Sequence, residues 1–180
     1  LTEQLGLILV PGVEIAEKNF HCNALFVTDF NAFFNLGMAE ALEVARKQDA
    51  FVFWNHPGWK ETPQWEPPGS TLHERGLIQG FELLNGTTLY PEAYPWAGEH
   101  RLTMFANSDI HAPMTSEYTP RQRPVTLVFA RTADVAGIRD ALIARRTAPW
   151  VNGEVWGVEE HLADLWKGAV QVENPDLRLK

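Results

Sequence analysis

The residues best suited to chemistry in this sequence are carboxylates and histidines at the ends of apolar runs or beside them. They are Glu14, His21, His56, Asp109 and His111. Carboxylate oxygens and imidazole nitrogens are the groups that bind Zn²⁺, Mn²⁺ and Fe²⁺ in proteins. If these side chains converge in the folded chain, they form a site for such a metal ion.

The Asp109–His111 pair is the best-marked part of this set. In extended backbone, residues i and i+2 point to the same side, so one short segment presents two ligands. His56 is followed by Pro57 and Gly58, which turn the chain sharply and would hold the imidazole at the end of its strand. The alternatives are a turn-forming Asp with a hydrogen-bonded His, a structural His56, and a salt bridge for a buried Glu14.

Apolar runs and helical periodicity indicate the elements that position these residues. We expect strands in the runs 7–10, 23–30, 51–54, 77–84, 102–106 and 125–130, and helices in 38–49, 132–146 and 158–166. Thr132 is the expected N-cap of the second helix. This alternation predicts a parallel α/β architecture, in which the carboxyl ends of the strands share the edge where active sites are built.

Composition limits the classes of function. The 180 residues suit one domain, with 45% hydrophobic and 21% charged residues. A net charge of −8 and the lack of a Lys and Arg cluster argue against a nucleic-acid partner. The single cysteine excludes an intrachain disulfide and a Cys-rich zinc site, and no apolar run approaches the ~20 residues that span a membrane.

The ordered motifs resemble one known family. The series Pro11–Glu14, His21, Asn55–Pro57 and Ser108–His111 is similar to the polymerase and histidinol phosphatase (PHP) superfamily, over about residues 7–150. The resemblance implies a metal-dependent phosphoesterase with a distorted TIM-like (β/α)7 barrel. It also implies two or three divalent ions, Zn, Mn or Fe, and a small phosphorylated substrate.

The resemblance assigns a role to each candidate residue. Glu14 would bridge two metal ions, and His21 and His56 would bind one of them. Asp109 and His111 would complete the site. The catalytic residues would be Glu14, His56, Asp109 and His111, which hold the ions that activate a hydroxide and neutralise the charge of the ester.

The chain departs from the family at its beginning. Family members open with a His-x-His strand and a Ser-Asp-Gly segment, and neither is present here. We therefore expect a barrel that is incomplete at the N-terminus, with two or more ligands outside these 180 residues. We assign residues 1–168 to this truncated hydrolase domain and 169–180 to a tail that links to a further domain.

The sequence is also compatible with two other functions, and it allows more than one role for several side chains. The alternatives are a metal-dependent amidohydrolase or other esterase, and a non-catalytic scaffold or binding module. We expect Glu82 to lie outside the site.

Trp59 and Trp65 form either a substrate-facing wall or loop packing. Other expected surface residues are His73, His100, His161, Lys18, Arg121 and Arg123, the last three with phosphate contact as an alternative. The compartment, cytoplasmic or periplasmic, and the oligomeric state are left open.

Overall fold

A mixed six-stranded sheet forms the larger part of the computed structural model, which describes residues 5–113, 119 and 122–170. Five strands follow one another as β1 (Gly12–Glu17), β2 (Phe20–Leu25), β3 (Phe51–Asn55), β4 (Gly80–Asn85) and β5 (Thr88–Leu89). The sixth, β6 (Thr103–Asn107), pairs with the other edge of β4.

The direction of the strands changes within this sheet. β1 and β2 form an antiparallel hairpin, and β2 is antiparallel to β3. β3, β4 and β6 run parallel, so their carboxyl ends lie at one edge. The predicted parallel arrangement is therefore confirmed for these three strands and wrong for the β1–β2 hairpin.

A second sheet lies beside β6. It is antiparallel and contains β7 (Val125–Val128), β8 (Thr147–Val151) and β9 (Glu154–Val155). Threonine hydroxyls connect the sheets: Thr147 Oγ1 donates to Met104 O at 2.8 Å, and Thr126 Oγ1 accepts from Ala106 N at 2.8 Å. The described residues form no closed barrel, so the fold observed here is a mixed α/β array of two adjoining sheets.

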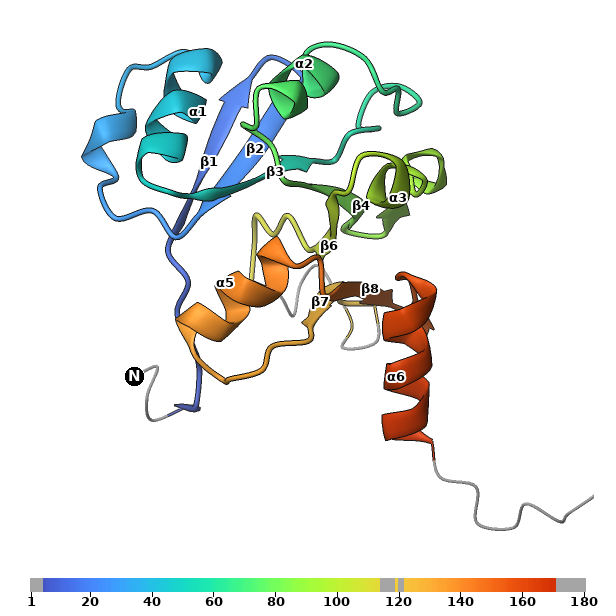
Figure 1. Ribbon diagram of the computed structural model, residues 1–180. Coiled ribbons are helices and arrows are strands. Elements are labelled where there is room, and N and C mark those ends of the chain that lie inside the picture. Colours follow the sequence, from blue (N-terminus) through green and yellow to red (C-terminus); the bar gives the residue numbers. More distant parts are fainter. Residues whose placement is uncertain (1–4, 114–118, 120–121, 171–180) are drawn as a thin grey trace, which may run out of the picture.

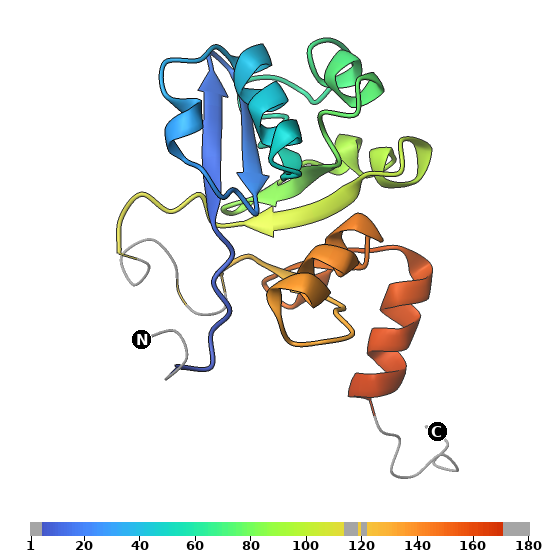
Figure 2. The same ribbon diagram turned by 60° about the vertical axis from the view of Figure 1, so that its left-hand side comes forward.

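Helices flank the two sheets (Figure 1). They are α1 (Met38–Lys47), α2 (Gly69–Glu74), α3 (Trp96–Glu99), α5 (Val135–Ile143) and α6 (Glu159–Ala169), with 3-10 turns at Asn31–Phe33 and Pro91–Ala93. α1 and α2 lie on one side of β1, β2 and β3, and α5 lies on the other (Figure 2). None of the helices in the described part of the chain is long and apolar enough to span a bilayer.

The helical face predicted for α1 packs against the main core. Leu42 and Ala45 are fully buried, and α1 ends two residues before Asp49, as the periodicity indicates. Phe53 and Phe105 stack on the opposite side of the sheet, at 4.2 Å between ring centroids, and Leu142 of α5 belongs to the same buried cluster.

Three expectations about the elements are wrong. Residues 7–10 form no strand, and Leu7 and Leu9 are 58% and 69% exposed, because the hairpin register begins only at Gly12. The second strand ends before Phe26, whose φ of +66° interrupts extended backbone. Asp134, not Thr132, caps α5 by accepting a hydrogen bond from the backbone nitrogen of Gly137 at 2.6 Å.

The C-terminal part also differs from expectation. The predicted apolar stripe of the last helix buries no residue of α6, and Trp166 is 68% exposed. The segment from residue 57 to 80 contains the short helix α2. The division into a domain at 1–168 and a tail at 169–180 stays a prediction, since residues 171–180 lie outside the described residues.

Candidate metal centre

The hairpin register brings Glu14 and His21 onto one face of the sheet. Glu14 pairs with Asn23, and His21 pairs with Asn55, so alternation along β2 directs these residues to the same side. The neighbouring Cys22 points to the opposite side and is fully buried. His56 directly follows β3, at the end of the sheet where His21 lies.

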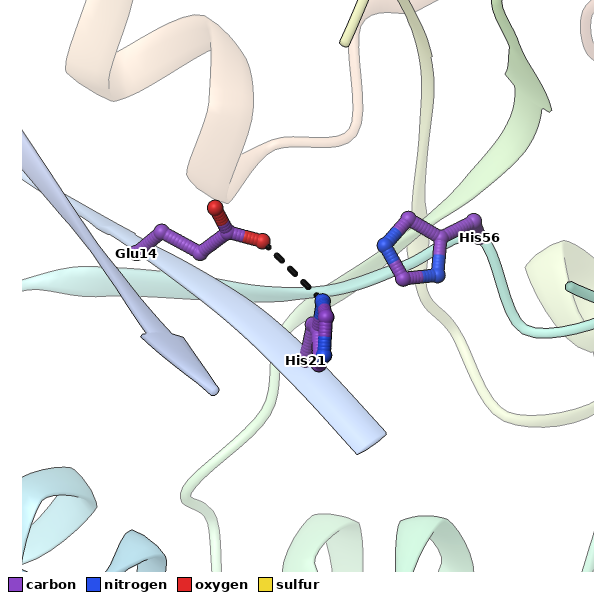
Figure 3. Close-up of side chains that lie close together, drawn as sticks. All are labelled: Glu14, His21 and His56. Carbon is purple, nitrogen blue, oxygen red and sulfur yellow. Dashed lines mark ion pairs between the residues drawn. The ribbon is translucent and has the colours of Figure 1, made fainter. Parts of the chain in front are cut away.

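Glu14, His21 and His56 form a compact group (Figure 3). One potential ligand atom of each residue lies within 4.8 Å of the others. Glu14 Oε1 lies 3.2 Å from His21 Nδ1, and the two imidazole rings are 4.8 Å apart, nearly perpendicular. The side chain of Glu14 is 48% exposed and that of His21 is 19% exposed, so the group opens to solvent on the Glu14 side.

His56 is the buried member of the group, at 6% exposure. Within the part of the chain that the structure describes, its Nδ1 is buried without a hydrogen-bond partner. Burial, and then the neighbouring His21, lower the pKa of His56, while Asp109 and Glu14 oppose that shift. A neutral imidazole with a free nitrogen is the form that binds a metal ion, so the group fits a divalent transition metal.

Glu82 fixes the backbone of His56 from inside the sheet. It is 2% exposed, and its carboxylate accepts hydrogen bonds from His56 N at 2.7 Å, Asn85 Nδ2 at 2.9 Å and Asn107 Nδ2 at 2.8 Å. Burial raises the pKa of Glu82 to about 7, although the three hydrogen bonds act in the opposite direction. The carboxylate thus joins the carboxyl ends of β3, β4 and β6.

Glu82 lies closer to the candidate site than its sequence context predicts. It is not part of the Glu14–His21–His56 group, but it holds one member of that group in place. The signal was a carboxylate inside the apolar run Phe81–Leu84, because such a residue is almost never fully buried without partners.

Asp109 and His111 are placed differently from one another. Asp109 follows β6, and its negative charge raises the pKa of both His56 and Glu82, although it is not a member of the Glu14–His21–His56 group. The side chain of His111 is 81% exposed, and its Nδ1 lies 2.7 Å from the backbone oxygen of Asp109. Asp109 has a φ of +48°, so the extended geometry that would align the two side chains is absent. Their role as ligands stays a prediction.

The two loop tryptophans have separate environments. The ring of Trp59 lies 5.5 Å from that of His21 and 5.3 Å from that of His56, and Trp59 is 51% exposed. Trp65 instead stacks on His100 at 3.8 Å between ring centroids and contacts His73 at 5.5 Å. Trp59 therefore lies at the candidate site, whereas Trp65 takes part in loop packing.

The remaining candidates have no place in the group. His73 and His100 are half-buried around Trp65, which corrects the expectation that they are simple surface residues. His161 of α6 lies 5.6 Å from the ring of Phe129. Lys18 is in the β1–β2 turn, and Arg121 lies outside the described residues.

Comparison with solved structures shows a similarity over nearly the whole chain. No family model and no curated protein matches the chain. Its structure is similar to the crystal structure of a two-domain protein from Bacteroides vulgatus that contains a predicted PHP-like metal-dependent phosphoesterase, with a TM-score of 0.92 and 36% sequence identity. The match covers 98% of this chain and 54% of that one, so the chain spans about half the length of that relative.

Proposed function

We propose that this chain is part of a PHP-type metal-dependent phosphoesterase that acts on a small phosphorylated substrate. The observation that carries the proposal is the Glu14–His21–His56 group, in which a buried imidazole nitrogen has no hydrogen-bond partner among the described residues. The similarity to a protein with a predicted phosphoesterase of this type supports the choice of reaction. We propose further that the two sheets belong to a distorted TIM-like barrel.

Glu14, His21 and His56 would hold a divalent transition metal, Zn, Mn or Fe. Asp109, which follows β6, and His111, after a rearrangement of its exposed side chain, would complete a site for two or three ions. A bound ion of this kind supplies a Lewis acid and activates a water molecule at neutral pH. This would also reconcile a net charge of −8 with an anionic substrate, because metal ions provide the local positive charge.

The chain's own residues would perform three tasks in this reaction. Glu82 anchors the backbone of His56, so the imidazole enters the site in a fixed position. Asn55 Nδ2 donates to Glu14 Oε1 at 3.3 Å, which orients that carboxylate toward His21. The lowered pKa of His56 keeps its ring neutral and able to bind a cation near pH 7.

The same site could serve a metal-dependent amidase or another esterase, but no observation favours either reaction. A scaffold without catalysis is disfavoured by the donor set, since Glu14, His21 and His56 lie together with a free imidazole nitrogen.

Metal content and phosphatase activity test this proposal. Elemental analysis of the purified protein should find bound metal, and calorimetric titration with Zn²⁺ and Mn²⁺ should show tight binding. His21→Ala and His56→Ala should each lower the affinity for these ions by at least tenfold. His161→Ala on α6 is the matched control and should bind like the wild type. The metal-loaded protein should hydrolyse p-nitrophenyl phosphate. Absence of bound metal, or equal affinity in His56→Ala, would contradict the proposal.

A further inference from the structure

We propose that Trp59 and Lys60 form a leaving-group subsite that selects phosphate esters with a planar ring in the leaving group. The inference rests on the proposed function and names the substrate class of that site. It starts from the position of these two side chains beside the Glu14–His21–His56 group, which the ring contacts of Trp59 establish.

A turn with two anchors fixes the position of Trp59. The backbone nitrogen of Trp59 donates to His56 O at 3.0 Å, and the backbone nitrogen of His56 donates to Glu82 Oε2 at 2.7 Å. Between them, Gly58 packs so closely that a Cβ atom would lie 2.6 Å from Cδ1 of Tyr90. The indole is therefore held three residues from a candidate metal ligand by backbone and core contacts.

The exposure of Trp59 separates it from the structural tryptophans nearby. Trp54 and Trp96 are 8% and 4% exposed and stack on one another in the core. Trp59 is 51% exposed, although its ring is within 5.5 Å of both imidazoles. An aromatic ring that remains half accessible at a ligand site offers a stacking surface to a second planar ring.

Lys60 adds a positive charge at the same place. Its Nζ lies 4.3 Å from the centroid of the Trp59 ring and donates a hydrogen bond to Asn19 Oδ1 at 2.7 Å. Two contacts thus hold the ammonium over the indole, and that indole lies beside the imidazoles of His21 and His56. A cation there attracts an anionic ester, and the exposed part of the indole contacts the ring that leaves with the ester oxygen.

Binding of phosphonates tests the subsite without turnover. Phenylphosphonate and ethylphosphonate carry the same charged group, so their ratio of affinities measures ring selection alone. Calorimetry on the Mn²⁺-loaded full-length protein should show about a three- to tenfold preference for phenylphosphonate. Trp59→Leu, compared at the same Mn²⁺ content as the wild type, should remove the preference. Trp166→Leu, at a tryptophan that is also exposed but lies on the distant helix α6, should retain it.

Lys60→Gln should lower the affinity for both phosphonates by a similar factor of about three to ten, and it should leave the ratio of the two affinities unchanged. An unchanged preference in Trp59→Leu, or no phosphonate binding by the wild type, would overturn the inference. The proposed function fails separately, if the metal-loaded wild type hydrolyses neither phenyl phosphate nor ethyl phosphate. Hydrolysis of both esters at equal kcat/KM, with no phosphonate preference, would retain the function and overturn the subsite.

Discussion

The buried carboxylate of Glu82 accepts a hydrogen bond from the backbone nitrogen of His56 at 2.7 Å, which ties the interior of β4 to the residue after β3. Two asparagines from the ends of β4 and β6 donate to the same carboxylate. The Glu82 carboxylate thus links the ends of three parallel strands and fixes the backbone position of His56, one residue of the candidate metal centre. It also makes the stability of this region dependent on the charge of a single buried group.

The first prediction concerns the pH dependence of unfolding in the metal-free protein. Burial raises the pKa of Glu82 from 4.5 to about 7, so the folded state holds this proton more tightly than the unfolded chain. Stability from this group is therefore fully present below pH 4.5 and is lost as the pH rises through about 7. Urea unfolding in EDTA should show that the contribution of Glu82 to the free energy of unfolding falls by roughly 3 kcal/mol between these two pH values.

Glu82→Gln should remove this part of the slope, because the amide does not titrate. Glu159→Gln, on the surface of α6, is the control and should keep the wild-type slope. Identical slopes for wild type and Glu82→Gln would mean that Glu82 titrates normally in the folded protein.

The second prediction is that Gly58→Ala destabilises the protein. The new Cβ would lie 2.6 Å from Cδ1 of Tyr90 and 2.9 Å from Pro63, so the turn after His56 must shift. Overpacking of this kind costs about 1–3 kcal/mol, measurable by urea unfolding. Gly98→Ala in α3, where no atom lies within 4 Å of the added Cβ, should be neutral or stabilising. Equal stability of both variants would show that the turn yields freely.

The third prediction separates His56 from His111 in metal binding. Since His56 is buried with a free Nδ1 and His111 is 81% exposed, His56→Ala should weaken the first Zn²⁺ by at least tenfold. His111→Ala should change it by less than about threefold. Calorimetric titration gives both affinities. An equal loss in the two variants would mean that His111 turns into the site when the ion binds.

The fourth prediction is that the Cys22 thiol is inert in the folded protein. The residue is fully buried on the side of β2 opposite His21, and burial, with a smaller effect of Glu14, raises its pKa well above the usual range. Only the thiolate reacts with disulfide reagents, so labelling with 5,5′-dithiobis(2-nitrobenzoic acid) should be at least about a hundredfold slower than in 6 M urea. Rapid labelling of the native protein would indicate that the hairpin opens readily.

The fifth prediction concerns the start of α5. Asp134→Ala removes the acceptor for the backbone nitrogen of Gly137 and should cost about 1 kcal/mol, or roughly 2–4 °C in Tm. Thr132→Val removes only the hydroxyl that donates to Asp134 Oδ1, so it should cost less. Thermal unfolding of both variants decides which residue is the cap, and a larger loss in Thr132→Val would favour the threonine.

Local patterns in the sequence determined several elements directly. The apolar face of α1 and the continuous apolar run of β3 are properties of neighbouring residues, and both elements lie where the patterns place them. The chemistry of the candidate residues was also readable, because Glu14, His21 and His56 carry donor atoms that suit a metal ion. Strands 7–10 and 23–30 were misplaced, since apolar content alone does not indicate which backbone segments find a partner.

Only the tertiary structure decided how the Asp109–His111 pair relates to the other residues. Spacing suggested that both side chains point one way, but the positive φ of Asp109 separates their directions. Glu14 and His21 meet because an antiparallel hairpin aligns them, and Glu82 reaches His56 because β3 and β4 are parallel neighbours. Residue types determine which groups can bind an ion. Strand pairing and backbone dihedrals, which depend on contacts distant in sequence, determine which groups meet.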